Sequence, residues 1–109
     1  MTNILLKTQD ARGVVTLTLN DPARFNALGS EMLQALQTAL DAIAQDSSAR
    51  AVVLAANGKA FCAGHNLKDM AAHPQLDYYQ DLFAQCSRMM LSIAKLPVPV
   101  IARVQGMAT

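Results

Sequence analysis

The stretch Ala51–Met70, AVVLAANGKAFCAGHNLKDM, contains the features that decide the fold of this 109-residue chain. Its first six residues are all apolar, which is typical of a strand that is covered on both faces of a sheet. Asn57 and Gly58 end this strand, because both residues favour turns. A glycine-containing segment then leads to Asn66, which can cap a short helix. The stretch therefore predicts a strand, a loop and a helix start in the middle of the chain.

Three further strands are predicted around this junction. Residues 4–8, ILLKT, are one strand candidate, and residues 14–20 alternate valine and leucine with threonine. That alternation is typical of a strand with one buried face. Residues 98–104, VPVIARV, have the composition of another buried strand.

Two amphipathic helices are predicted between these strands. The first begins at Ser30 as a cap, and apolar residues then recur on one helical face. The second begins at Asp77, which forms a capping box with Gln80, and it ends before Pro97. The resulting order β-β-α-β-α-β favours an α/β fold in which helices connect parallel strands by right-handed crossovers.

The composition narrows the classes of function. The net charge is +1 with no block of like charge, so the chain lacks the basic patch that nucleic-acid binding requires. No apolar run is long enough to span a bilayer, and we see no secretory signal, so we expect a cytoplasmic protein without a membrane partner. Hydrophobic residues make up 52%, and an isolated chain of this length is expected to leave strand faces uncovered.

Side chains of the central stretch allow two kinds of site. Cys62 and His65 have the spacing C-x-x-H, but His73 and Cys86 are too scattered to complete a zinc site, so we expect no metal. Cys62 could instead be a nucleophile that His65 activates. The alternative is that Cys62 is a small core side chain, since free cysteine is usually buried.

The backbone of the same stretch allows a third kind of site. An N–H group at Gly64 or His65 would point outward where the loop meets the helix, and glycine permits unusual backbone angles and close approach of a ligand. Such amides bind anions or stabilise negative charge on a carbonyl oxygen. The alternative is an ordinary strand-to-helix turn.

Three segments together resemble the enoyl-CoA hydratase/isomerase (crotonase) superfamily. They are NDPARFNALGSEM (Asn20–Met32), the central Ala51–Met70 stretch and KLPVPVIARVQGMA (Lys95–Ala108), and the similarity extends from Val14 to Thr109. The resemblance implies an α/β, crotonase-like ββα spiral fold. It also implies that residues 1–109 are the N-terminal portion of a single domain whose C-terminal portion is absent.

The resemblance implies chemistry on acyl-CoA thioesters. In this family two backbone amides hold the thioester oxygen, and the position of the first amide is His65 here. The implied function is a 2-enoyl-CoA hydratase, a lyase, without a cofactor beyond the coenzyme A of the substrate. The alternatives are another reaction, such as isomerisation or hydrolysis, and acyl-CoA binding without turnover. A full-length protein is expected to form a homotrimer or hexamer.

The resemblance also implies which residues contact coenzyme A, and the loop Arg24–Ala27 matches a segment that touches it in relatives. The implied contact residues are Arg24, Ala27, Ala63, Gly64, His65, Asn66, Leu67 and Lys68. For Arg24 and Lys68 the alternative is an ordinary solvated cation. Asn66 departs from the aspartate that relatives usually have, which keeps the capping ability and removes a charge. The second amide and the acidic catalytic residues of the family are expected beyond Thr109.

Overall fold

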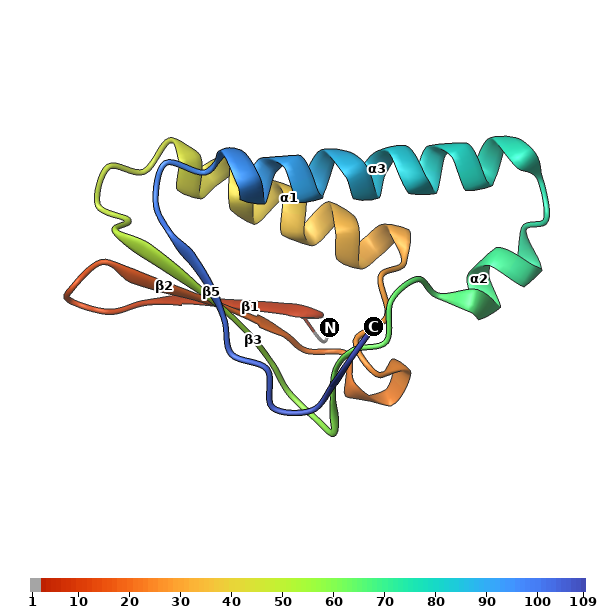
Figure 1. Cartoon of the computed structure of the whole chain (residues 1–109), viewed down its shortest axis with the longest axis horizontal. Coiled ribbons are helices and arrows are strands. Elements are labelled where there is room, and N and C mark those ends of the chain that lie inside the picture. The colour runs from red at the N-terminus through yellow and green to blue at the C-terminus, as the bar shows by residue number, and fades with distance from the viewer. Residues whose placement is uncertain (1–2) are drawn as a thin grey trace.

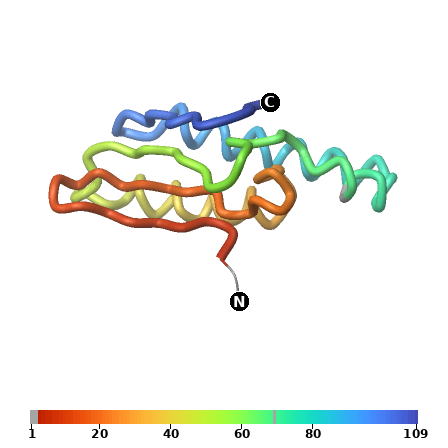
Figure 2. The backbone as a smooth tube through the Cα atoms, turned by 90° about the horizontal axis from the view of Figure 1, so that it is seen from below, coloured from red at the N-terminus to blue at the C-terminus, as the bar shows by residue number. Residues whose placement is uncertain are grey.

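A computed structural model describes residues 3–109 of the chain, except for the side chain of Asp69. The fold has two layers, a four-stranded sheet with the order β1-β2-β3-β5 and two long helices that cover one of its faces (Figure 1). Figure 2 shows β1, β2 and β3 side by side in front of helix α1, so both views place the helices on the same face.

The sheet combines an antiparallel hairpin with two parallel pairs. Strands β1 (Leu5–Gln9) and β2 (Val14–Leu19) are antiparallel, whereas β3 (Ala51–Ala56) is parallel to both β2 and β5 (Val100–Ala102). Parallel neighbours require long connections, and helices supply them between β2 and β3 and between β3 and β5. The predicted order of these elements and the one-sided burial of β2 are confirmed.

The helices pack along each other above the sheet. Helix α1 (Ser30–Ala44) lies beside α3 (Leu76–Lys95), and the short α2 (Leu67–Ala72) precedes α3 at the end away from the sheet (Figure 1). The predicted apolar stripe of α1 is buried, comprising Met32, Leu33, Leu36, Leu40 and Ile43. In α3 only Leu82 and Met89 are fully buried.

The predicted caps of the two long helices are both wrong. Gly29 occupies the N-cap of α1, and Ser30 is the first helical residue, whose Oγ donates a hydrogen bond to Gln85 Oε1 (3.1 Å). Gln75 occupies the N-cap of α3, so Asp77 lies inside its first turn. The hydroxyl of Ser30 thus connects the two helices instead of capping one of them.

A second, smaller sheet was not predicted. Strand β4 (Ala60–Cys62) pairs in parallel with β6 (Met107–Ala108), and Thr109 N donates to Cys62 O (2.9 Å). Strands this short have too few residues for a recognisable pattern. Gly106 permits the approach, because a Cβ atom there would overlap the backbone of Lys59.

The predicted buried strand over residues 98–104 is wrong in extent and in burial. Only Val100–Ala102 form a strand, and the side chain of Ile101 is 57% exposed. Pro97 and Pro99 have no backbone N–H, so the ladder begins at Val100. The face of β5 is therefore uncovered, as expected for an isolated chain, whereas β3 is buried or half-buried throughout.

None of the helices within residues 3–109 combines the length and the apolar character needed to cross a membrane.

Candidate functional site

Two loops meet where β2 and β4 end, and backbone hydrogen bonds join them. Ala63 N donates to Phe25 O (3.0 Å), and Leu28 N donates to Gly64 O (2.6 Å). The loop before α1 and the loop before α2 therefore form one unit. Phe25 and Asn26 both have a φ of 54°, a left-handed conformation that asparagine tolerates and phenylalanine rarely adopts.

The side chain of Asn26 fastens this unit to the turn between β3 and β4. It is fully buried, its Oδ1 accepts from Asp21 N (2.7 Å), and its Nδ2 donates to Asn57 O (2.9 Å) and Ala60 O (3.1 Å). The Oδ1 and Nδ2 atoms of Asn26 thus both bond to backbone groups. Asn26 was predicted only as part of a loop near coenzyme A, and the structure gives it a structural role.

The backbone N–H of His65 has no hydrogen-bond partner among the described residues. Gly64 O points at Leu28, and in a trans peptide the next N–H points the opposite way. His65 N accordingly has no acceptor within hydrogen-bond distance among residues 3–109, while Gly64 N contacts Cys62 Sγ (3.4 Å). Of the two predicted amides, that of His65 is therefore the available one.

Gly64 produces this orientation. Its φ of 82° lies in the left-handed region, which L-residues with a Cβ atom rarely adopt. The turn directs the carbonyl of Gly64 to Leu28 and the N–H of His65 away from Leu28. Glycine is thus needed at position 64 so that the peptide bond between Gly64 and His65 can adopt this orientation.

A partly open cavity of about 450 Å³ lies over the two joined loops. Its lining consists of Ala23, Arg24, Phe25, Ala27, Ala63, His65, Asn66, Leu67 and Lys68. Seven of the eight predicted contact residues line it, all except Gly64. Phe25 was predicted only as part of the loop Arg24–Ala27, and Ala23, directly before that loop, was not predicted. That these residues share one cavity is a structural finding, and their contact with coenzyme A remains a prediction.

The two cations of the cavity differ in their surroundings. Arg24 is exposed and lies 4.0 Å from the carboxylate of Asp21. Lys68 is exposed in the first turn of α2. Asn66 directly precedes α2, and its backbone O accepts from Met70 N (3.1 Å), as expected for the predicted N-cap position.

Cys62 is a core side chain. It is buried in β4, and His65 Nδ1 makes no hydrogen bond to it or to any other described residue. The imidazole instead packs edge-on against Phe83 of α3. Burial raises the pKa of the Cys86 thiol, which lowers its nucleophilicity at neutral pH. The geometry does not favour a cysteine nucleophile.

No group of three or more His, Cys, Asp or Glu residues that could hold a metal ion occurs among the described residues.

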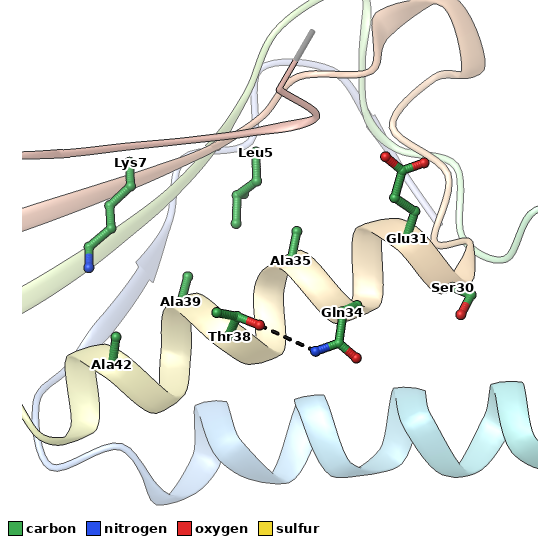
Figure 3. A pocket seen from close by; sticks show the side chains of 9 residues that line it. All are labelled: Leu5, Lys7, Ser30, Glu31, Gln34, Ala35, Thr38, Ala39 and Ala42. Carbon is green, nitrogen blue, oxygen red and sulfur yellow. Dashed lines mark hydrogen bonds between the residues drawn. The ribbon is translucent and has the colours of Figure 1, made fainter. Parts of the chain in front are cut away.

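Two other hollows have different characters. Figure 3 shows an open groove between β1 and α1, into which Leu5, Ala35 and Ala39 point and where Gln34 bonds to Thr38 (3.3 Å). A cavity of about 290 Å³ between the sheet and the helices is almost entirely apolar, with Leu36, Phe61 and Met89 in its lining. The groove is also lined by the charged residues Lys7 and Glu31, which lie outside the predicted site.

Comparison with known proteins identifies the family. The sequence matches the enoyl-CoA hydratase/isomerase family over residues 9–109. It is 40% identical over 101 residues to the mitochondrial enoyl-CoA hydratase domain-containing protein 3 of Xenopus laevis, covering 93% of this chain and 34% of that protein. It is 38% identical over 101 residues to the 1,2-epoxyphenylacetyl-CoA isomerase of Escherichia coli, covering 89% of this chain and 38% of that protein.

The fold comparison agrees with the sequence comparison. A crystal structure of an enoyl-CoA hydratase from Mycobacterium smegmatis superposes with a TM-score of 0.93 at 60% identity, covering 94% of this chain and 40% of that one. The predicted crotonase-like α/β fold is thereby confirmed. The chain spans only about a third to two fifths of the length of these relatives. The chain belongs to the enoyl-CoA hydratase/isomerase family.

Proposed function

We propose that the protein containing this chain hydrates 2-enoyl-CoA thioesters, with the backbone N–H of His65 as one donor of the oxyanion hole. The observation that carries the proposal is the amide of His65, which has no partner among residues 3–109 and belongs to a residue that lines the cavity. An amide fixed in advance costs no reorganisation when charge develops, and one such donor contributes about 10²–10³ in rate. The names of several relatives support an acyl-CoA substrate.

The reaction assigns a clear task to this amide. Water adds its oxygen to C3 of the conjugated thioester while a base takes one of its protons. The electron pair of the C2=C3 bond then forms a double bond between C1 and C2, and the carbonyl π pair moves onto the thioester oxygen. His65 N–H stabilises the enolate that results, and a proton delivered to C2 completes the addition. No further cofactor takes part, since the coenzyme A moiety belongs to the substrate.

The two cations that line the cavity, Arg24 and Lys68, give a testable prediction of this proposal. Arg24→Ala and Lys68→Ala are each expected to weaken coenzyme A binding roughly two- to fivefold at low salt, because exposed charge contacts contribute little individually. Titration calorimetry with acyl-CoA at low and high salt measures the effect, which salt should diminish. Arg12→Ala is the matched control, since Arg12 is exposed at the β1–β2 turn and paired with Asp10. Full affinity of the Arg24/Lys68 double variant at low salt would contradict the proposed phosphate contacts.

A second candidate function is acyl-CoA binding without turnover. Among the described side chains that line the His65 cavity, none is a carboxylate. A hydratase needs groups that take a proton from water and deliver one to C2. Binding requires only the amide and the cavity.

Absorbance distinguishes the two candidates. The conjugated thioester of crotonyl-CoA loses its ultraviolet band when water adds, so hydration is followed directly on adding the protein. We expect the band to disappear catalytically and 3-hydroxybutyryl-CoA to form. A steady band together with measurable acyl-CoA binding would establish the binder instead, and a shifted double bond with no added water would establish an isomerase.

The proposal extends to assembly and location. A homotrimer or hexamer, with neither nucleic acid nor membrane as partner, is the expected form of the whole protein, and the cytoplasm is its predicted compartment.

A further inference from the structure

The imidazole of His65 packs against helix α3. Its ring packs edge-on against Phe83, with ring centroids 5.0 Å apart and an angle of 72° between the planes. Its Nδ1 is buried and has no hydrogen-bond partner. One ring nitrogen, Nδ1, is therefore enclosed, and any hydrogen bond from the ring to solvent depends on the other nitrogen, Nε2.

The surroundings of Nδ1 determine where the proton of the neutral ring lies. A neutral imidazole has one N–H donor and one acceptor nitrogen. Orphaned buried N–H groups are rarer than buried acceptors that lack a partner, so Nδ1 is better placed as the acceptor. The proton then resides on Nε2. Nε2 makes no hydrogen bond within residues 3–109 and is not among the enclosed atoms without a partner, so it keeps contact with solvent.

His65 consequently has two donors without a partner among residues 3–109, its backbone N–H and its Nε2–H. Both belong to one residue that lines the cavity. If the amide holds the thioester oxygen, a group that reaches Nε2 must lie only a few atoms away along the acyl chain. An oxygen substituent on the acyl carbons next to the thioester meets this requirement, whereas a plain alkyl chain leaves Nε2–H without an acceptor.

We propose that the imidazole of His65 is a specificity-determining residue that selects acyl-CoA thioesters with an oxygen substituent near the thioester over unsubstituted ones. This inference rests on the proposed function, because it uses the amide of His65 as the anchor for the thioester. It adds a role for the side chain that the backbone role does not require. A ligand hydrogen bond of this kind changes affinity roughly three- to tenfold.

The test compares 3-hydroxybutyryl-CoA with butyryl-CoA, which differ by one hydroxyl group. Calorimetric titration of the protein is expected to show roughly three- to tenfold tighter binding of the hydroxylated thioester. His65→Leu should bring the ratio of the two affinities close to one, and His65→Gln, whose amide keeps a donor, should restore part of it. His73→Leu is the matched control, because His73 is exposed and stacks on Tyr78 (4.7 Å) away from the cavity.

Each outcome bears on a separate claim. Equal affinities for the two thioesters in the unmodified protein, or an unchanged ratio in His65→Leu, would overturn the selectivity and leave the proposed function intact. Failure of both thioesters to bind would overturn the proposed function together with this inference. A ratio that falls equally in His73→Leu would show that the effect does not arise at His65.

Discussion

Asn26→Ala is expected to lower the free energy of unfolding by about 3–5 kcal/mol, because each buried group left without a partner costs about 1–3 kcal/mol. The substitution removes hydrogen bonds to Asp21 N, Asn57 O and Ala60 O at a side chain with no exposure. It also places alanine at a φ of 54°, which asparagine tolerates better. Urea denaturation of the variant beside the unmodified protein measures the loss.

Asn57→Ala is the matched control for this substitution. The Asn57 side chain is exposed, and its one hydrogen bond in the described structure, to Asn20 Oδ1 (3.0 Å), is also exposed. Its removal should cost about 0.5 kcal/mol or less. A loss at Asn26 no larger than that at Asn57 would mean that the joined loops do not depend on the buried amide.

Gly64→Ala is expected to reduce turnover of a 2-enoyl-CoA about 100-fold, the usual cost of losing one oxyanion donor. A Cβ atom at a φ of 82° is strained by about 1–2 kcal/mol, and relief requires rotation of the peptide between Gly64 and His65. That rotation breaks the bond from Leu28 N to Gly64 O and turns the His65 N–H away. Steady-state hydration of crotonyl-CoA measures the effect.

Gly13→Ala is the control that separates the effect of backbone strain from the effect of turning the His65 N–H away. Gly13 has a φ of 84°, nearly the same as Gly64, but it lies in the turn between β1 and β2. Its replacement also brings the new Cβ against the backbone of Ser48, so it should destabilise the protein at least as much. We expect its turnover per folded molecule to be unchanged. Equal losses of turnover in the two variants would indicate that general destabilisation explains the Gly64 result.

The central elements could be predicted because their patterns are long. The alternation in β2 and the apolar stripe of α1 each continue for several residues, and burial follows them closely. The caps could not be predicted in the same way. Ser30 has a partner in α3, Gln85, that is 55 residues away, and this contact outweighs its local tendency to cap.

Tertiary placement also explains the errors at the end of the chain. Residues 98–104 have the composition of a covered strand, but the described helices leave Ile101 exposed, and two prolines shorten the ladder. Strands β4 and β6 depend on a close backbone approach at Gly106 that no local pattern signals. Asn26 was assigned to a loop, because a buried amide cannot be recognised without its distant partners Asn57 and Ala60.

The candidate site was predicted in part from its motif. The cavity brings together seven of the eight residues that the resemblance named, and their contact with coenzyme A remains a prediction. The chemistry of the residues left Gly64 and His65 open as amide donors, whereas the resemblance named His65, and neither could show why the His65 amide has no partner in the described part of the chain. That follows from the bond between Leu28 N and Gly64 O, which joins two loops far apart in the sequence.

Nuclear magnetic resonance of the His65 amide tests the central claim most directly. The protein, labelled with ¹⁵N, is titrated with butyryl-CoA and with the matching thioether, which lacks the carbonyl oxygen. We predict that the amide proton of His65 moves downfield with butyryl-CoA and not with the thioether, because only the thioester supplies an acceptor. Binding of butyryl-CoA that leaves the His65 amide unmoved, or that moves it equally with the thioether, would contradict the role assigned to this N–H.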